Sequence, residues 1–212
     1  MLRVCEIFAS MQGESTHAGR PCVFLRLSGC NLRCSYCDTS YAYQEGNDRS
    51  LDDIARTIAS FGIPLVELTG GEPLLQAETP LLAQRLCDNG FEVLLETNGS
   101  FDISNLDPRI HVVMDIKTPS SGTAAHTHWM NIGFLKKDDE VKFVLEGRPD
   151  YEWARRVTLE QALASKCTVL YSPVFGRLLP SDLASWILED RLPVRLNLQI
   201  HKYIWPPDMR GV

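Results

Sequence analysis

The stretch Gly29-Cys30-Asn31-Leu32-Arg33-Cys34-Ser35-Tyr36-Cys37-Asp38-Thr39 places three cysteines within eight residues. Three residues separate the first two cysteines, and two residues separate the last two. An iron–sulfur cube of four irons needs four ligands when every iron is bound by protein, so three thiolates leave one iron open to a small molecule. The spacing therefore indicates a [4Fe–4S] cluster, held by Cys30, Cys34 and Cys37, whose open iron carries the chemistry.

Two other roles of these cysteines remain open from the spacing. Cys34 and Cys37 form a pair of the kind that binds zinc, and Cys30 with one of the five histidines could complete a tetrahedron, although the chain has no second such pair. A disulfide is a weaker alternative, because no secretory signal precedes the cysteines and a chain of 212 residues does not need cross-links.

The composition predicts one domain over residues 1–212, since 44% hydrophobic content in a chain of this length supplies one well-buried core. Seven cysteines without an apolar leader indicate a reducing, cytoplasmic compartment. No apolar run approaches the roughly 20 residues that span a bilayer, so we expect no membrane partner. The formal charge of −6 argues against a nucleic-acid partner. The four remaining cysteines are expected to be small core side chains: Cys5, Cys22, Cys87 and Cys167.

Apolar runs and helical patterns alternate along most of the chain. The predicted strands are Cys22–Leu27, Pro64–Leu68, Phe91–Leu95, Ile110–Ile116, Val141–Leu145 and Thr168–Tyr171, with a last extended segment at Val194–Ile200. The predicted helices are Leu51–Phe61, Thr79–Gly90, Tyr151–Leu163 and Ser181–Leu188, the first of them capped by Ser50 with Asp53. The residues around Val4–Phe8 read as a short extension ahead of the main fold, and Ser120–Lys137 has no assignment.

Repeated strand–helix units with almost continuously apolar strands predict a parallel sheet covered by helices. Six such strands fit a partial (β/α)6 barrel of the TIM-like kind, with a short N-terminal extension, better than a closed ring of eight. In such barrels the chemistry lies at the carboxyl ends of the strands. Polar residues follow the strands at these ends: Thr69-Gly70-Gly71-Glu72-Pro73, Glu96-Thr97-Asn98-Gly99, Asp115-Ile116-Lys117-Thr118-Pro119-Ser120-Ser121-Gly122 and Ser172-Pro173-Val174.

The cysteine spacing together with Gly70-Gly71-Glu72-Pro73 resembles the signature of radical S-adenosylmethionine (SAM) enzymes. The resemblance implies that the amino and carboxylate groups of SAM occupy the free iron. It also implies that backbone carbonyls of the glycine motif hold the amino group of the cofactor, and two glycines let the main chain approach a ligand closely. A strand-to-helix turn rich in glycine is the alternative for that motif.

Further motifs resemble one family within this superfamily, the 7-carboxy-7-deazaguanine synthases of queuosine and 7-deazapurine biosynthesis. They are Glu6-Ile7-Phe8, Gln12-Gly13-Glu14, Gly19-Arg20-Pro21, Arg26-Leu27-Ser28-Gly29-Cys30-Asn31-Leu32, Cys37-Asp38-Thr39, the stretch from Asp115 to Gly122, and Gln199-Ile200-His201-Lys202-Tyr203-Ile204-Trp205. The resemblance implies a lyase that converts 6-carboxy-5,6,7,8-tetrahydropterin into 7-carboxy-7-deazaguanine with ring contraction and loss of ammonia. It further implies Mg²⁺, an external reductant such as flavodoxin or ferredoxin, and a homodimer.

The same resemblance assigns site residues. The SAM residues are Tyr36, Cys37, Asp38, Gly71, Lys117 and Ser120, and the Mg²⁺ ligand is Thr39. The substrate residues are Gln12, Gly13, Glu14, Arg26, Thr69, His201 and the C-terminal Val212. No side chain is assigned as a catalytic acid or base, because the 5′-deoxyadenosyl radical of the cofactor abstracts hydrogen from C6 of the substrate and later returns it.

The residue types suit these roles, and each has an ordinary alternative. The guanidinium of Arg26 offers the two-pronged donor that a carboxylate accepts, but it could instead form a salt bridge. The hydroxyl of Thr39 suits a hard cation, but it could cap a turn. Gln12 and Glu14 could read the donor-rich edge of a pterin or lie in a solvated turn. A chain end such as Val212 could be disordered.

Two competing functions remain at this point. A glycyl-radical-enzyme activating enzyme shares the compact cysteine spacing and acts on a partner protein, whereas the motifs around Gln12 and His201 favour a small molecule. A structural or electron-transfer module carrying zinc or a cluster would leave the polar strand ends without a purpose.

Overall fold

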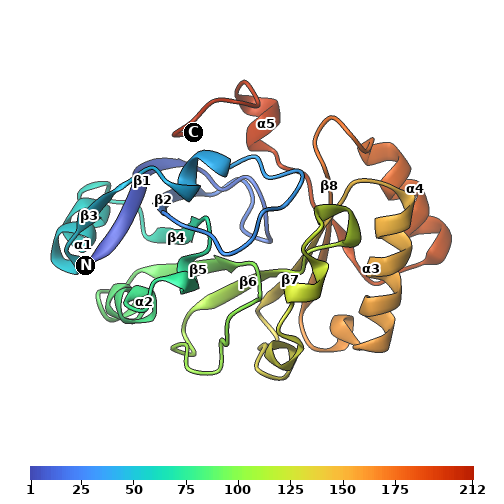
Figure 1. Cartoon of the computed structure of the whole chain (residues 1–212), viewed down its shortest axis with the longest axis horizontal. Coiled ribbons are helices and arrows are strands. Elements are labelled where there is room, and N and C mark those ends of the chain that lie inside the picture. The colour runs from blue at the N-terminus through green and yellow to red at the C-terminus, as the bar shows by residue number, and fades with distance from the viewer.

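The computed structural model describes all residues from 1 to 212 and contains one sheet of nine strands in the order β3-β1-β2-β4-β5-β6-β7-β8-β9. The strands are β1 Leu2–Met11, β2 Pro21–Leu27, β3 Asn47–Arg49, β4 Leu65–Gly70, β5 Glu92–Thr97, β6 His111–Asp115, β7 Glu140–Leu145, β8 Thr168–Pro173 and β9 Arg195–Leu196. From β2 to β9 every neighbouring pair is parallel. The two outermost strands do not pair with each other, so the sheet curves into an open barrel, as predicted (Figure 1).

The N-terminal extension is part of this sheet. Strand β1 runs antiparallel to β2, with Met11 opposite Pro21 and Val4 opposite Leu27, and β3 pairs with its other edge. The loop between β1 and β2 therefore lies at the amino-terminal ends of the parallel strands, opposite the end at which the cysteine loop leaves β2. This placement brings residues 12–20 to the end of the barrel that is formed by the amino-terminal ends of the strands.

Helices α1 to α4 pack on the outside of the sheet, with α1 and α2 near one end and α3 and α4 near the other, whereas α5 lies apart from them near the C-terminus (Figure 1). Their bounds are α1 Leu51–Ser60, α2 Thr79–Asp88, α3 Arg148–Glu160, α4 Pro180–Asp190 and the short α5 His201–Ile204. The predicted cap is present, since the amide of Asp53 donates to Ser50 Oγ at 3.1 Å. Ile54 and Ile58 of α1 are fully buried in a core of 35 residues that joins the helices to the sheet. Burial of such a stripe, rather than helix propensity alone, stabilises helices of this length.

Two segments differ from the sequence-based expectation. The extended segment Val194–Ile200 contains only the two-residue strand β9, because the chain then turns so that the amide of Ile200 donates to the carbonyl of Gly13 at 2.9 Å. The unassigned segment Ser120–Lys137 contains short 3₁₀ turns instead of a helix or strand. The buried Asn131 fixes it by donating to the carbonyls of Gly99 and Phe101. Tertiary hydrogen bonds of this kind leave no periodic pattern in the sequence.

All seven cysteines carry free thiols. Cys22 and Cys167 are buried, as predicted, whereas Cys5 and Cys87 are only half-buried. Burial raises the pKa of Cys167 to about 11. None of the helices has both the length and the apolar character that crossing a bilayer requires.

Candidate active site

The carboxyl ends of the parallel strands open into one cavity of about 780 Å³. The cavity has the size of pockets that hold small molecules and cofactors. The cysteine loop, the glycine motif and the C-terminal residues all contribute to its lining. The predicted site residues that line it are Gln12, Gly13, Glu14, Arg26, Cys30, Cys34, Tyr36, Cys37, Asp38, Thr39, Thr69, Gly71, Lys117, His201 and Val212. Ser120 is the predicted residue that does not line it.

The cysteine loop follows β2 and presents three half-buried thiols to the cavity. The amide of Leu32 donates to Cys30 Sγ at 3.4 Å, and Cys34 Sγ lies 3.2 Å from Thr123 Oγ1. Such donors stabilise thiolate ligands. Three half-buried thiols that line one open cavity fit a cluster with a free iron.

The glycine motif lies directly against the cysteine loop. The amide of Glu72 donates to the carbonyl of Gly29 at 2.8 Å, and a Cβ atom at Gly71 would collide with that carbonyl and with Cys30 Cβ. The carboxylate of Glu72 is fully buried and accepts from the amides of Leu74 and Asn98 at 2.9 and 2.7 Å. The motif thus has two parts. Gly71 permits the close approach, and Glu72 ties the turn to the end of β5.

A second group of predicted residues surrounds the cavity beside the cysteines. Lys117 Nζ donates to Asp115 Oδ2 at 2.8 Å; burial would lower the pKa of Lys117, but Asp115 together with Cys34 and Tyr36 outweighs burial and raises it. The phenol of Tyr36 lies 3.2 Å from Thr118 Oγ1, and burial raises its pKa to about 12. Ser120 instead turns its hydroxyl to Asp150 of α3, while its carbonyl accepts from Ser35 Oγ at 2.7 Å. Ser120 therefore anchors the cysteine loop, and its expected contact with SAM stays a prediction.

Arg26 projects from β2 between Glu6 of β1 and Thr69 of β4, which are its neighbours in the sheet register. Its Nε donates to Glu6 Oε1 at 2.7 Å, and its guanidinium lies 6.0 Å from the centre of the Tyr41 ring. The side chain is 16% exposed, and its two Nη groups make no hydrogen bond within the chain. The salt bridge and the substrate role are therefore compatible, because Glu6 occupies Nε and leaves the Nη pair facing the cavity.

The inside of the barrel holds a charged network that the sequence analysis missed. Lys142 is 4% exposed and its Nζ pairs with Glu14 Oε2 at 2.9 Å, with Glu96, and with Asp115 Oδ2 at 3.6 Å. Burial alone would lower the pKa of Lys142, but these carboxylates outweigh it and raise that pKa well above its usual value. Burial likewise opposes the charge of Glu14, but Lys142 together with a hydrogen bond from Gln199 outweighs burial, so the pKa of Glu14 is lowered.

Glu67 is the other buried acid of the network. Its carboxylate accepts from Gln12 Nε2, and burial together with the nearby Glu96 raises its pKa well above the usual value. Glu67 and Lys142 each sit in an apolar strand segment, Val66-Glu67-Leu68 and Val141-Lys142-Phe143. Successive side chains of a strand point to opposite faces of the sheet. A charged residue between apolar residues of a predicted strand was therefore the feature of the sequence that could have indicated this network.

The C-terminal segment closes over the cavity. The Nδ1 atom of His201 occupies the space where a side chain at Gly13 would begin, so a Cβ at Gly13 would collide with it. Lys202 Nζ donates to Asp38 Oδ2 at 2.6 Å, and this ammonium outweighs desolvation and lowers the pKa of Asp38. Arg210 stacks 3.6 Å from the centre of the Tyr41 ring. These contacts bring the chain end, including Val212, to the site.

The hydroxyl of Thr39 is not used as a turn cap. It precedes the 3₁₀ turn Ser40–Tyr43 without capping it, and it donates to Asp38 Oδ1 at 3.0 Å. Its oxygen lone pairs and the neighbouring carboxylate offer the oxygen donors that a hard cation prefers.

Known proteins match this chain along its whole length. A profile of the radical SAM superfamily matches residues 25–158. A protein of Chlorobaculum tepidum named 7-carboxy-7-deazaguanine synthase is 47% identical over 214 residues, covering 100% of this chain and 97% of its own. The chain belongs to the 7-carboxy-7-deazaguanine synthase family. A Koribacter versatilis member of that family is 41% identical over 228 residues and is matched along 100% of both chains.

The solved structures agree on the fold. The crystal structure of QueE from Escherichia coli matches with a TM-score of 0.73 at 21% identity, covering 93% of each chain. Streptococcus suis SuiB bound to S-adenosylmethionine matches 80% of this chain and 48% of its own, with a TM-score of 0.56 at 14% identity. The family and the partial-barrel fold predicted from the motifs are therefore confirmed. Membership of the 7-carboxy-7-deazaguanine synthase family, together with the radical SAM profile, makes the chain a radical SAM lyase, and the superfamily implies a [4Fe–4S] cluster and SAM.

Proposed function

We propose that this protein converts 6-carboxy-5,6,7,8-tetrahydropterin into 7-carboxy-7-deazaguanine, with ring contraction and release of ammonia, in queuosine and 7-deazapurine biosynthesis. The observation that carries the proposal is the full-length similarity to proteins named 7-carboxy-7-deazaguanine synthase, 47% identical in the case of Chlorobaculum tepidum. The lining of the cavity supports it, because three cysteines and a paired set of charges face the same space. A [4Fe–4S] cluster bound there supplies the electron that cleaves SAM reductively to a 5′-deoxyadenosyl radical.

The residues of the chain have positioning roles in this proposal. Cys30, Cys34 and Cys37 hold the cluster. Gly71 brings the backbone close to the methionine end of SAM, and Tyr36, Cys37, Asp38 and Lys117 surround the cofactor. The protein supplies binding, orientation and shielding, while the cofactor supplies the radical chemistry.

The substrate is held at the far side of the same cavity. The Nη groups of Arg26 donate to the C6 carboxylate, since a planar guanidinium matches a carboxylate with two parallel bonds. Gln12, Gly13 and Glu14, with Thr69, receive the pterin ring, and the C-terminal segment with His201 and Val212 closes over it. Lys142 fixes the position and the charge of Glu14.

Further features follow from the family resemblance. Thr39 is a ligand of Mg²⁺, and its position next to Asp38 at the cavity wall supports this role. The chain acts in the cytoplasm as a single radical SAM core domain and as a homodimer, and it receives electrons from an external reductant such as flavodoxin or ferredoxin.

The alternative of a glycyl-radical-enzyme activating enzyme is less well supported. Such an enzyme must admit a segment of a partner protein, whereas here Lys202 and Arg210 fasten the C-terminal segment over the cavity through Asp38 and Glu45. A buried network of ionised side chains also suits a small polar molecule better than a peptide backbone.

Anaerobic reconstitution followed by turnover tests the proposal. The enzyme is incubated with 6-carboxytetrahydropterin, SAM, Mg²⁺ and a reductant, and the products are identified by mass. We expect about four irons and four sulfides per chain, and formation of 7-carboxy-7-deazaguanine with one ammonia. Cys34→Ala should lose both cluster and turnover, whereas Cys167→Ala should keep both. Cleavage of SAM without conversion of the pterin would favour an activating enzyme, and one zinc per chain in the cysteine loop would favour a structural module.

A further inference from the structure

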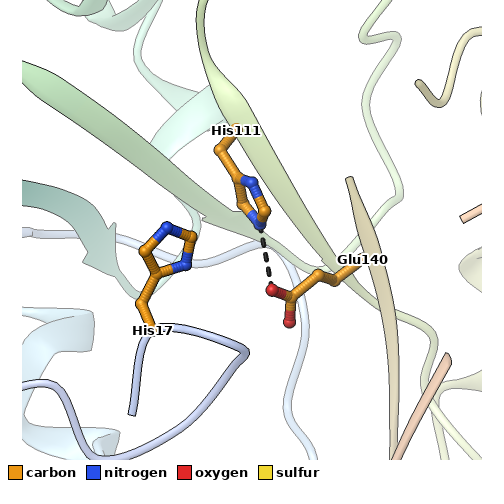
Figure 2. A group of neighbouring side chains, drawn as sticks. All are labelled: His17, His111 and Glu140. Carbon is orange, nitrogen blue, oxygen red and sulfur yellow. Dashed lines mark hydrogen bonds and ion pairs between the residues drawn. The ribbon is translucent and has the colours of Figure 1, made fainter. Parts of the chain in front are cut away.

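A second cluster of metal-binding side chains lies at the opposite end of the barrel from the cysteines. The ligand atoms of His17, His111 and Glu140 all lie within 4.8 Å of one another (Figure 2). His111 is the first residue of β6 and Glu140 the first of β7, whereas His17 belongs to the loop between β1 and β2. The cluster is therefore at the amino-terminal ends of the strands and outside the lining of the active-site cavity.

Two buried atoms of this cluster have no partner in the chain. Glu140 is fully buried; its Oε1 atom lies 3.0 Å from His111 Nε2 and accepts from the amide of Thr16 at 3.0 Å. Its second oxygen, Oε2, makes no hydrogen bond, and neither does the buried Nδ1 atom of His17. Buried polar atoms are almost always satisfied, because leaving one without a partner costs free energy. Two such atoms within one small cluster indicate a missing ligand.

The surroundings prepare His17 to act as a ligand. Its Nε2 atom lies 3.0 Å from Glu92 Oε1, and Glu92 is held in turn by Arg20 Nη1 at 2.8 Å. This hydrogen bond leaves Nδ1 as the free ring nitrogen. A carboxylate that fixes one nitrogen of a histidine while the other binds a metal is a common arrangement at zinc sites.

Glu140 supplies the carboxylate ligand of the cluster. Its carboxylate is fully buried at the start of β7, and its Oε2 atom is left without a partner in the chain. The buried carboxylate of Glu140 and the two imidazole rings make a donor set of two nitrogens and one oxygen. Imidazole and carboxylate together suit zinc, and the Irving–Williams order favours zinc over manganese or ferrous iron at such a site.

We propose that His17, His111 and Glu140 bind one zinc ion, with the fourth position of the tetrahedron taken by solvent. The ion fastens the β1–β2 loop to the first residues of β6 and β7. That loop also contains Gln12 and Glu14, which line the active-site cavity. The zinc site is thus a structural support for the floor of the cavity, and it is independent of the identity of the substrate.

The competing explanation is a hydrogen-bonded cluster that holds the same loop without a metal. His111→Gln and Glu140→Gln separate the two explanations, because an amide can preserve the hydrogen bond between these positions while it removes a good zinc ligand. His126→Gln is the matched control, since His126 is exposed and lies away from the cluster. The reconstituted holoenzyme and each variant are dialysed anaerobically against zinc-buffered solutions, and zinc and iron are counted per chain.

Zinc X-ray absorption then identifies the ligands in the presence of the iron cluster. We expect one zinc per chain, with nitrogen and oxygen neighbours at about 2.0–2.1 Å and no sulfur at about 2.3 Å. A free zinc concentration of a hundred times the Kd of the site should raise the melting midpoint of the enzyme by about 5–10 °C. Zinc affinity should fall at least about 100-fold in His111→Gln and Glu140→Gln, and remain unchanged in His126→Gln, with iron content constant throughout.

Three results would overturn the proposal. The first is the absence of zinc uptake by the holoenzyme at micromolar zinc. The second is sulfur in the zinc shell, which would place the ion in the cysteine loop. The third is zinc binding that is unchanged in both His111→Gln and Glu140→Gln.

Discussion

Replacement of Arg26 by alanine is expected to weaken binding of 6-carboxytetrahydropterin by about 30-fold to 4,000-fold. The side chain is 16% exposed, so its Nη groups meet the substrate carboxylate in a largely dry environment. Loss of a charge-assisted pair of this kind costs about 2–5 kcal/mol, and each 1.4 kcal/mol is about tenfold in affinity. Arg26→Lys should recover only part of the loss, because an ammonium keeps the charge without the planar fork.

A matched variant separates binding from folding. Glu6→Gln weakens the salt bridge to Arg26 Nε but leaves both Nη groups in place. Both Arg26→Ala and Glu6→Gln should lower folding stability by about 1–3 kcal/mol, as expected for a partly buried pair. Only Arg26→Ala should lose substrate affinity. The assay is anaerobic equilibrium dialysis of the pterin, with iron content and SAM binding measured in parallel. Unchanged pterin binding in Arg26→Ala, or equal losses of affinity in both variants, would refute the carboxylate assignment.

Other variants test the remaining parts of the site. Gly71→Ala should weaken SAM binding by about 5-fold to 150-fold, since the added Cβ forces the cysteine loop to move; Gly133→Ala, where a Cβ meets nothing within 4 Å, should bind SAM normally. Thr39→Ala should raise the Mg²⁺ concentration needed for half-maximal rate at least about tenfold, and an identical magnesium titration would remove Thr39 from the site. Lys142→Met should destabilise the fold at pH 7, as measured by urea unfolding. Because the folded-state pKa of Glu14 is lowered, its pairing contributes stability above the unfolded pKa that is lost as pH falls through the folded value. The gap between wild type and Lys142→Met should therefore shrink in acid, and a constant gap would contradict this pairing.

The parallel strands and the first helix were predictable because their patterns are local. Strand β4 contains the apolar residues Leu65, Val66 and Leu68, and the apolar residues of α1 recur at helical spacing behind a Ser50 cap. The cysteine loop was equally readable, since its three ligands lie within eight residues. Local patterns of this kind are sufficient to place the cluster loop at a strand end.

The charged network around Lys142 and the cluster of His17, His111 and Glu140 were not predictable in the same way. Lys142 meets Glu14 across 128 residues of sequence, and Glu140 meets Thr16 across 124. Only the barrel brings these pairs together. The closure of the C-terminal segment likewise depends on long-range contacts such as Lys202 with Asp38, 164 residues apart. The family resemblance predicted that the C-terminal residues His201 and Val212 lie at the active site, whereas no local sequence pattern predicted this.

The fate of the hydrogen at C6 tests the central claim most directly. The reconstituted enzyme is given 6-carboxytetrahydropterin with deuterium at C6, and recovered SAM, 5′-deoxyadenosine and product are examined by mass. We predict deuterium in the adenosyl group of recovered SAM, with many product molecules formed for each SAM consumed. Cleavage of SAM without transfer of deuterium, or one SAM consumed for each product, would contradict the account.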